Sequence, residues 1–380
     1  MTAVVGETAQ SLPLPAGLVT PALVVDLDIL DRNMAEMAAI CRASGVELWP
    51  HAKTHRTVEY GRRQLAAGAA GLTVARLEEA EAFASAGVAR ILVAYPLAGE
   101  AKLARAGVLA QRAHVTLATD SLTGARAIGR HFAILGSSVP VFLIINTGMN
   151  RCGVTPQEAV PLAREMAGVK GIRLCGIMTH EGSVYEAENR DDLVSRSQQV
   201  AATMVAAGRG ISAAGQPLET ISLGASASAR VVAPVPGVTQ LRPGIYAFND
   251  LGQIALGNAS AATCAARVVA SVVSHPAPDR ALIDAGSKSL SGDRAPGRGA
   301  ERYPGYGLLA DLPGWELFRL SEEHGWLRWT GEGPPAPLEI GQQVQVVPNH
   351  ICSVFWNMGA STGISQGAVV GSWRIIERNT

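Results

Sequence analysis

Apolar residues in the first two thirds of the chain form short β-branched runs that alternate with longer amphipathic or alanine-rich segments. Each run is separated from the next by enough chain for a crossover helix. Eight runs can be counted, at residues 23–27, 46–49, 71–75, 91–95, 115–118, 141–146, 174–178 and 221–223. Repeated strand–helix units predict a parallel sheet, and eight of them predict a closed (β/α)8 barrel of the TIM type.

Two of the intervening segments show helical spacing directly. In the first, Asp28 is the expected N-cap and Gly45 ends the helix. Its apolar face consists of Leu30, Met34, Met37 and Cys41. The second predicted helix runs from Asp191 to about Arg209 with a weaker apolar stripe. Both agree with an α/β barrel.

After residue 260 the pattern changes to alternating strands without a convincing helix. These strands are expected near residues 266–272, 282–284, 326–329, 344–347 and 369–376. We therefore predict three parts: an N-terminal segment 1–22 that packs with a β domain, a barrel over 23–260, and a mostly-β domain over 261–380. A Gly/Pro/Ser-rich excursion at 287–313 is expected to be a functional loop.

The charge balance narrows the class of partner. Lysine plus arginine number 32, equal to aspartate plus glutamate, so no net charge attracts nucleic acid or an anionic membrane. The first 15 residues lack the pattern of a signal peptide, and no apolar run approaches the ~20 residues of a membrane span. A cytoplasmic protein with a small-molecule partner is expected.

The five cysteines show no paired spacing and their number is odd, which argues against a disulfide framework. Four of them, Cys41, Cys152, Cys175 and Cys264, occupy apolar or helical patterns and are expected to be buried in the core. Cys352 differs, because His350 lies two positions before it. In extended chain their side chains point the same way, as two ligands of one metal must. A core cysteine beside a surface histidine is the alternative.

Polar residues that directly follow the predicted strands are the first candidates for chemistry, because barrel enzymes work at the C-terminal ends of their strands. Lys53 follows the second run, where a lysine can form a Schiff base with an aldehyde. The small-residue turns at 224–226 and 242–246 could hold a phosphate on their backbone N–H groups. An exposed lysine and ordinary turns are the alternatives.

Seven motifs in order along nearly the whole chain resemble one family, the fold-type III pyridoxal-phosphate enzymes related to D-threonine aldolase and D-serine dehydratase. They are the segments at 20–26 (TPALVVD), 50–55 (PHAKTH), 149–153 (MNRCG), 180–185 (HEGSVY), 242–246 (RPGIY), 284–286 (DAG) and 348–352 (PNHIC). The resemblance implies an alanine-racemase-type barrel followed by a β domain, and a homodimer with active sites at the interface.

The resemblance also implies roles for individual residues. Lys53 would be the catalytic residue and carry pyridoxal 5'-phosphate, with Arg151 near the cofactor's phenolic oxygen and Tyr185 near its pyridine nitrogen. The phosphate would lie on Gly224, Ser226, Gly244 and Ile245, and the remaining cofactor contacts would come from His180 and Tyr246. A divalent metal, zinc, manganese or cobalt, would bind His350 and Cys352.

The implied reaction is the elimination of water from a D-3-hydroxy amino acid. Lys53 would take the Cα proton, the metal would assist loss of the 3-hydroxyl, and an oxo acid and ammonia would result. Aldolases of this family tend to have aspartate where this chain has Cys352, so a dehydratase is favoured. The expected substrate is D-threo-3-hydroxyaspartate or D-serine, and the former would give oxaloacetate. Candidates for its second carboxylate are His51, His55 and Lys288.

Three alternatives to a dehydratase remain. A D-threonine aldolase giving glycine and an aldehyde would share almost every residue. A racemase or decarboxylase of the same fold type would share the barrel but would not need the His350–Cys352 pair. A non-catalytic pyridoxal-phosphate-binding protein would typically be a barrel alone, whereas here more than a hundred residues follow the predicted barrel.

Overall fold

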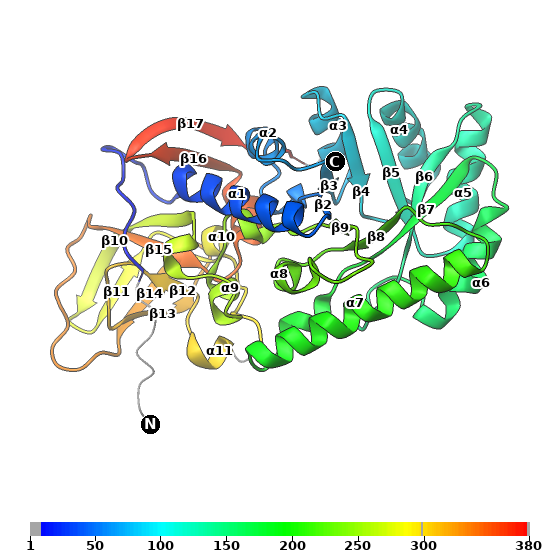
Figure 1. Cartoon of the computed structure of the whole chain (residues 1–380). Helices are drawn as coiled ribbons and strands as arrows, with labels where there is room; N and C mark the ends of the chain where they lie inside the picture. The colour runs from blue at the N-terminus through cyan, green and yellow to red at the C-terminus, as the bar shows by residue number, and fades with distance from the viewer. Residues whose placement is uncertain (1–8, 298, 378–380) are drawn as a thin grey trace. The chain divides into compact units, whose positions relative to one another are not determined.

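Eight parallel strands form one sheet in the order β2-β9-β8-β7-β6-β5-β4-β3 (Figure 1). They are β2 (Glu47–Leu48), β3 (Leu72–Val74), β4 (Arg90–Val93), β5 (His114–Thr119), β6 (Val139–Ile144), β7 (Ile172–Thr179), β8 (Thr220–Leu223) and β9 (Gln240–Leu241). The chain after β2 also pairs with β3 through a bridge between His51 and Thr73. The sheet therefore curls back on itself, and the predicted alanine-racemase-type barrel is confirmed.

This computed structural model describes residues 9–297 and 299–377, and the chain divides into two compact units. The barrel unit contains residues 35–185 and 191–244, with 376–377 added from the C-terminal end. The β unit contains the described residues of 9–34, 186–190 and 245–375. Each unit is treated separately below.

Helices connect the barrel strands, and α3 to α6 lie on the outer side of the sheet in Figure 1. The helices of this part are α2 (Val58–Ala66), α3 (Leu77–Ser85), α4 (Glu100–Ala110), α5 (Leu122–Ile134), α6 (Pro156–Ala167), α7 (Arg190–Ala213) and α8 (Ala229–Val232). The helix predicted from Asp191 is α7, which is longer at both ends. Its buried face includes Leu193, Val200 and Met204, the predicted stripe.

The first apolar run is not a barrel strand, which corrects the count made from the sequence. Residues Ala22–Asp26 form β1 in the β unit, where β1 pairs with β10 (Ala266–Ala277) and with β16 (Ala360–Ser365). The eighth barrel strand is β9, only two residues long. A continuous apolar run indicates burial on both faces but does not identify the sheet, and a two-residue strand shows no periodicity.

The first predicted helix is α1 (Leu27–Ala43), whose four predicted apolar positions are all buried. Its N-cap differs from the expectation, because the Asp26 carboxylate accepts the Ile29 N–H at 2.9 Å. Asp28 instead accepts a hydrogen bond from the Ser365 hydroxyl at 3.0 Å. The strand ends at Asp26, one residue earlier than expected, and the helix begins at Leu27, so the cap falls two residues earlier.

The β unit contains a nine-stranded sheet with the path β13-β14-β11-β10-β1-β16-β17, and β15 joins it by pairing with β10 and β12. The strands not yet defined are β11 (Arg280–Ile283), β12 (Gly307–Leu309), β13 (Trp315–Leu320), β14 (Gly325–Trp329), β15 (Gln343–Pro348) and β17 (Ala368–Arg374). The predicted mostly-β domain is confirmed. The short helices are α9 (Leu251–Ala255), α10 (Ser287–Leu290) and α11 (Gly299–Arg302).

One further helix was not predicted, and it matters for the site. Helix α12 (Ile351–Met358) begins directly after β15, where the sequence was interpreted as extended chain. Its apolar side is formed by Ile351, Val354 and Phe355, which are almost fully buried. Their spacing of three and four residues is typical of a helix, but the segment was interpreted as a continuation of the preceding strand.

The segment before β1 lies against the β-unit sheet over its described part. Ala9 bridges to Ala310, and the backbone of Leu12 exchanges two hydrogen bonds of 2.8 Å with the side-chain amide of Gln345. The Thr20 hydroxyl donates to Asp284 at 2.6 Å. Residues 1–8 of the predicted N-terminal segment lie outside the described residues.

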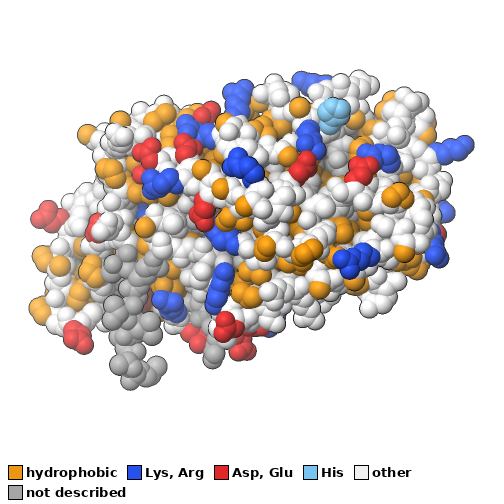
Figure 2. All heavy atoms as spheres, viewed as in Figure 1, with side chains coloured by type: hydrophobic (Ala, Val, Ile, Leu, Met, Phe, Trp, Pro, Cys, Tyr) orange, Lys and Arg blue, Asp and Glu red, His pale blue; other side chains and the backbone are white. Residues whose placement is uncertain are grey.

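Basic and acidic side chains are interspersed over the face drawn in Figure 2. On that face neither sign of charge forms a continuous field of the kind that attracts nucleic acid. Among the described residues no helix is both long and apolar enough to cross a membrane.

Candidate active site

The candidate cofactor residues of the barrel unit all follow the C-terminal ends of its parallel strands. Lys53 lies on the 3-10 turn η1 (Ala52–Thr54) after β2, and Arg151 lies on the loop after β6. His180 follows β7, Ser226 follows β8 and Gly244 follows β9. The carboxyl ends of parallel strands share one rim, so the structure brings these sequence-predicted residues to the same end of the barrel.

Two neutral histidines accompany the cations at this rim. Burial, reinforced by the positive charges of Lys53 and Arg151, lowers the pKa of His180 to about 3. Burial and the charges of Lys53 and Arg242 lower the pKa of His51 well below its ordinary value. Each effect requires the named charges to lie close to the imidazoles. Both histidines therefore stay uncharged at neutral pH.

His180 and Glu181 hold the Gly224 turn from both sides. The imidazole Nδ1 of His180 lies 2.6 Å from the Gly224 carbonyl oxygen, so Nδ1 carries the proton and donates it. The Glu181 carboxylate accepts the Gly224 N–H at 2.6 Å and the Ser228 hydroxyl at 2.8 Å. A trans peptide directs its C=O and N–H in opposite directions, so the next N–H, on Ala225, points away from His180.

Glycine is required at two positions of the rim because of close approaches. A Cβ on Gly224 would lie 2.5 Å from a guanidinium nitrogen of Arg242, and a Cβ on Gly244 would lie 2.5 Å from the Thr54 hydroxyl. Gly244 also donates its N–H to the Ser226 hydroxyl at 3.1 Å. The Lys53 turn and the two small-residue turns are therefore packed directly against one another.

The backbone of these turns fits a phosphate. Across residues 9–297 and 299–377, the N–H groups of Ala225 and Ile245 donate to no protein acceptor, although both residues are more than nine-tenths buried. Buried N–H groups without a partner are costly, and an anionic oxygen would satisfy them. The donor set of the predicted cofactor site thus matches the group it is expected to bind.

Arg242 is a buried arginine that organises the same rim. Its Nε donates to the Ser222 hydroxyl at 2.7 Å, and its guanidinium also donates to the Thr179 carbonyl. Burial lowers the pKa of Arg242 to about 10, with the Glu181 charge opposing the effect, so it remains charged at neutral pH. Arg242 therefore joins the ends of β7, β8 and β9.

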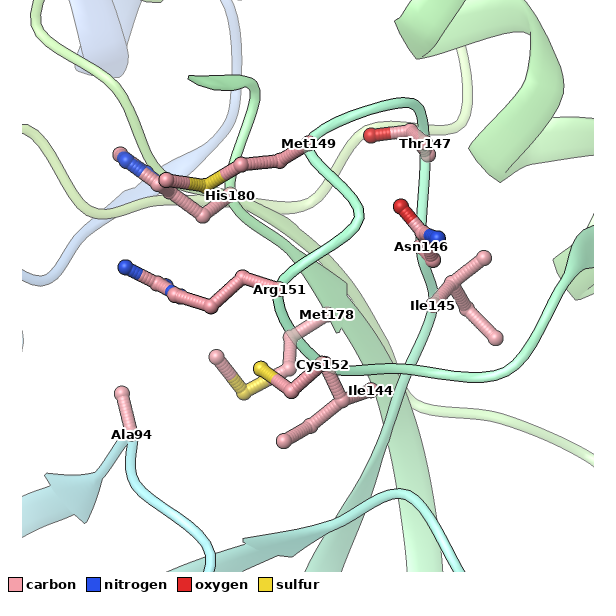
Figure 3. Close-up of a pocket in the computed structure, with 10 residues that line it drawn as sticks. All are labelled: Ala94, Ile144, Ile145, Asn146, Thr147, Met149, Arg151, Cys152, Met178 and His180. Atoms are coloured by element: carbon pink, nitrogen blue, oxygen red, sulfur yellow. The ribbon is translucent and has the colours of Figure 1, made fainter. Parts of the chain in front are cut away.

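Arg151 lies on a loop that Asn146 holds in shape. The Asn146 side-chain oxygen accepts the N–H groups of Gly148 and Asn150 at 3.0 and 3.1 Å. Arg151 and His180 both line one pocket and extend to the same side of it in Figure 3. Cys152 is half-buried in that pocket, so it is not the core cysteine that was predicted.

The remaining cysteines behave as expected for core residues. Cys41, Cys175 and Cys264 are buried, and burial raises the pKa of the Cys41 and Cys175 thiols to about 11. All five cysteines are free thiols.

The aromatic candidates occupy different surroundings. The rings of Tyr185 and His180 have centroids 6.4 Å apart with an interplanar angle of 40°, so the two side chains are neighbours at the barrel rim. Tyr246 is buried on the 3-10 turn η3 (Ile245–Ala247), which begins at Ile245. Both tyrosines therefore lie on segments that also carry other predicted cofactor residues.

The predicted metal pair lies in the β unit, but not in extended chain. His350 is the N-cap residue of α12 and Cys352 lies in its first turn. Their side chains still lie close together. Although burial opposes it, the charge of Cys352 and the hydrogen bonds that the His350 imidazole donates to Asp250 and Cys352 raise the pKa of His350 well above its ordinary value. A helix start thus brings the two side chains together where a strand was predicted to do so.

Asp250 orients this pair. It is fully buried, and its Oδ2 accepts the Ile351 N–H at 3.1 Å and lies 3.5 Å from Nδ1 of His350. A carboxylate on Nδ1 leaves Nε2 of His350 as the nitrogen that faces a metal, the usual arrangement for a metal-binding histidine. The other carboxylate oxygen, Oδ1, accepts the Gln253 N–H at 2.9 Å and caps α9.

An imidazole nitrogen and a thiolate are donors that zinc prefers, so the two residues fit a divalent metal. Within the described part of the chain, no three His, Cys, Asp or Glu side chains gather as a metal-binding group. Two protein ligands would leave the other positions of a metal open to water or substrate.

The three candidates for a second substrate carboxylate are poorly suited to the role. His55 is fully buried, and burial lowers its pKa to about 4. The imidazole of His51 is likewise uncharged. Lys288 is exposed and already forms ion pairs of 2.9 Å with Glu322 and with Glu323. A group able to bind a second carboxylate has to be sought elsewhere.

Sequence reasoning missed three residues that shape the site. Glu181 and Arg242 lay inside the motifs that were recognised, but nothing in a motif indicates that a charged side chain is buried. Asp250 lay outside them. Its signal was an N-cap position just before the short helical run that begins at Leu251, and only the folded chain places it beside His350.

The chain matches two known domain families in sequence. Residues 25–251 match the N-terminal domain of alanine racemase, and residues 265–362 match a serine dehydratase domain. The first match alone spans more than half of the chain and contains every barrel strand.

Characterised relatives match almost the full length. D-threo-3-hydroxyaspartate dehydratase of Delftia sp. (strain HT23) is 34% identical, over 93% of this chain and 96% of that protein. D-threonine aldolase of Arthrobacter sp. is 30% identical, over 94% and 92% respectively. D-serine dehydratase of Dictyostelium discoideum is 26% identical, over 88% and 90%.

Solved structures agree with these sequence matches. The Delftia dehydratase superposes with a TM-score of 0.87 at 34% identity, over 94% of this chain and 98% of that one. A cysteine-to-alanine mutant of D-threo-3-hydroxyaspartate dehydratase, solved in a metal-free form, also gives 0.87 at 33% identity, over 94% and 98%. D-threonine aldolase of Filomicrobium marinum gives 0.87 at 28% identity, over 97% and 98%.

These relatives are lyases, and they act on small D-amino acids. Together with the barrel, the β unit and the lysine at the strand ends, the matches over nearly the full length leave one conclusion. The chain belongs to the fold-type III pyridoxal-phosphate family that includes D-threonine aldolase, D-serine dehydratase and D-threo-3-hydroxyaspartate dehydratase.

Proposed function

We propose that this protein is a metal-dependent dehydratase that converts D-threo-3-hydroxyaspartate to oxaloacetate and ammonia. The observation that carries the proposal is the His350–Cys352 pair, with Asp250 3.5 Å from the His350 imidazole. A racemase or decarboxylase would have no use for a pair of this kind, whereas elimination of a 3-hydroxyl needs an electrophile at that oxygen.

The barrel rim would hold pyridoxal phosphate. Lys53 would bind its aldehyde covalently, the N–H groups of Ala225 and Ile245 and the Ser226 hydroxyl would bind its phosphate, and Arg151 and Tyr185 would contact its ring. When bound, the cofactor supplies an electron sink for the carbanion that forms at the substrate Cα.

The residues of the rim then have separate tasks. Lys53 would be the group that takes the Cα proton on its Nζ. His180 keeps its proton on Nδ1, bound to the Gly224 carbonyl, and so presents a neutral ring. An uncharged His180 beside Lys53, Arg151 and Arg242 avoids adding a further positive charge to the rim.

The metal pair would act on the leaving group. His350 through Nε2 and Cys352 through its sulfur would bind zinc, manganese or cobalt, which supplies a Lewis acid for the substrate's 3-hydroxyl. Asp250 would hold the His350 ring in the orientation that metal binding needs.

A D-threonine aldolase is the second candidate, because an aldolase of this family is 30% identical over 94% of the chain. D-serine dehydratase is a third possibility within the same chemistry. Cys352 favours the dehydratases, since the aldolases of the family tend to have aspartate at that position.

Two broader properties belong to the same proposal. We expect a homodimer, as the family resemblance implies, and a cytoplasmic location, with which five free thiols agree. Size-exclusion chromatography with light scattering measures the first, and a mass of one chain would contradict it.

The role of the His350–Cys352 pair as metal ligands is tested by Cys352→Ala, with Cys264→Ala as the matched control from the same unit. We expect Cys352→Ala to lose bound metal and ammonia release together, because a thiolate ligand is removed, while Cys264→Ala keeps both. Metal content is measured by elemental analysis. Unchanged metal content in Cys352→Ala would return Cys352 to the core-cysteine interpretation and contradict the proposal.

A further inference from the structure

The excursion at 287–313 accepts hydrogen bonds from the residues on either side of the metal pair. The side-chain amide of Asn349, just before His350, donates to the carbonyl oxygens of Asp293 and Gly305, each at 3.0 Å. The Ser353 hydroxyl, just after Cys352, donates to the Asp293 carboxylate at 2.6 Å. Asp293 is therefore fixed from both sides by neighbours of the two ligands.

These contacts position one arginine. Arg294 follows Asp293, and its guanidinium carbon lies 4.5 Å from the ring centroid of Tyr306, which follows Gly305. The Tyr306 N–H donates to the Leu317 carbonyl at 2.8 Å, so the backbone that carries the ring is bound to β13. Asn349 thus brings together the two segments of the excursion that carry the arginine and the ring.

Arg294 is ready to bind an anion. Its flat face lies on Tyr306, but stacking leaves the N–H donors at the edge of the guanidinium available. Arg294 is exposed and, within residues 9–297 and 299–377, forms no ion pair with an acidic side chain. A guanidinium can bind a planar carboxylate through two parallel N–H···O hydrogen bonds.

The proposed substrate has a carboxylate that would need such a group. In 3-hydroxyaspartate the second carboxylate and the 3-hydroxyl are attached to the same carbon, whereas D-serine has hydrogen there and D-threonine a methyl group. Any side chain that binds the second carboxylate must therefore lie beside the metal pair that takes the hydroxyl. His51, His55 and Lys288 do not offer a free positive charge.

We propose that Arg294, supported on Tyr306 and fixed through Asn349, binds the second carboxylate and selects dicarboxylic substrates over D-serine and D-threonine. This inference rests on the proposed function, because it assigns the 3-hydroxyl to the His350–Cys352 pair. It gives the excursion a role as the specificity element of the β unit.

Equilibrium binding to the holoenzyme tests the inference without turnover. Malate is 3-hydroxyaspartate without its amine, and 3-hydroxypropionate is serine without its amine, so neither can react with the cofactor. Each is titrated calorimetrically into the metal-loaded wild type, Arg294→Gln and Arg319→Gln. Arg319 is the matched control, because it is exposed and stacked on Trp326 at 5.0 Å in the same unit.

We expect Arg294→Gln to weaken malate binding by about 10- to 100-fold, the usual loss for a charge-assisted hydrogen-bonded pair, and to leave 3-hydroxypropionate unchanged. Arg319→Gln should bind both acids as the wild type does. In turnover, Arg294→Gln should raise KM for hydroxyaspartate more than it lowers kcat, and leave both constants for D-serine unchanged.

Two results would overturn the inference. Equal malate binding by wild type and Arg294→Gln would remove Arg294 from the site. A wild type that binds malate no tighter than 3-hydroxypropionate would show that no second carboxylate is recognised. In either case, ammonia release from D-serine or D-threonine would show that the proposed dehydratase activity is correct and that only the role of Arg294 is wrong. If no D-3-hydroxy amino acid released ammonia, both the proposed activity and the role of Arg294 would be wrong.

Discussion

At the scale of single residues, burial keeps several histidines of this protein uncharged at neutral pH. Three of the eight histidines have lowered pKa values: His51 and His55, which are buried, and His180, which is partly buried. His55 shows how the neutral form is stabilised. Its Nδ1 accepts the Thr57 N–H at 3.0 Å, and its Nε2 donates to the Gln64 side chain at 3.2 Å. That pattern requires exactly one proton on the ring.

The pH dependence of stability follows from His55. Its pKa is about 4 in the folded protein and about 6.5 when unfolded, so between these values only the unfolded chain takes up a proton. The free energy of unfolding should therefore fall by about 3 kcal/mol from this residue alone as the pH drops from 7 to 4.

Urea unfolding of wild type and His55→Gln across pH 4–7 measures this contribution. The variant should show a smaller loss of stability on acidification, while His114→Gln, at an exposed histidine, should follow the wild type. Identical pH slopes for His55→Gln and wild type would contradict the assignment of a buried neutral imidazole.

The residues that the sequence could reveal are those whose type is itself the signal. Lys53, Gly224 and the His350–Cys352 pair could be proposed from chemistry and position along the chain. Glu181 could not, because its role depends on a burial and on contacts to Gly224 and Ser228 more than 40 residues away. Long-range contacts of this kind leave no local pattern.

At the scale of elements, the proposed cofactor and metal residues lie at the ends of strands and the beginnings of helices. The turns after β2, β8 and β9 pack so closely that Gly224 and Gly244 have no room for a Cβ. In the β unit, the junction of β15 and α12 places His350 as an N-cap residue and Cys352 in the first turn of the helix. The alternation of residues 344–347 predicted the strand correctly but gave no indication that a helix begins at Ile351.

The packing of the rim is tested by Gly244→Ala. A Cβ there would lie 2.5 Å from the Thr54 hydroxyl and 2.9 Å from the His51 carbonyl oxygen, so the Lys53 turn must shift. Overpacking of this degree costs about 1–3 kcal/mol, and we expect about 10-fold or greater loss of pyridoxal-phosphate affinity in an otherwise folded protein.

Cofactor titration followed by absorbance measures that affinity, with circular dichroism as the check on folding. Gly168→Ala is the control, because the nearest atom to its Cβ lies at an ordinary 3.6 Å and its backbone has negative φ. Wild-type affinity in Gly244→Ala would show that the two turns do not form one binding surface.

At the scale of the whole molecule, the chain forms two compact units with different parts of the chemistry. Lys53, Arg151, His180 and Ser226 belong to the barrel unit, whereas Ile245, Tyr246, Asp250 and the His350–Cys352 pair belong to the β unit. The architecture was predictable because strand–helix alternation and strand-only patterns are strong signals. The membership of β1 was not, since its apolar run would suit either sheet.

Different residues are proposed to hold the two groups, which predicts that metal removal leaves the cofactor in place. Lys53 and the phosphate-binding turns form no part of the metal pair, so chelation should abolish ammonia release without bleaching the cofactor absorbance. Elemental analysis verifies that the metal has gone, and activity should return when zinc, manganese or cobalt is added back. Full activity in verified metal-free protein would exclude the Lewis-acid role.

The central claim is that the enzyme breaks the Cβ–oxygen bond of a D-3-hydroxy amino acid. It is tested most directly by incubating the metal-loaded holoenzyme with D-threo-3-hydroxyaspartate and assaying both sets of products in one tube. The account predicts oxaloacetate and ammonia in equal amounts, with no glycine and no reaction of the L-enantiomer. Glycine and glyoxylate in place of ammonia would mean that the carbon–carbon bond is cleaved and that the protein is an aldolase.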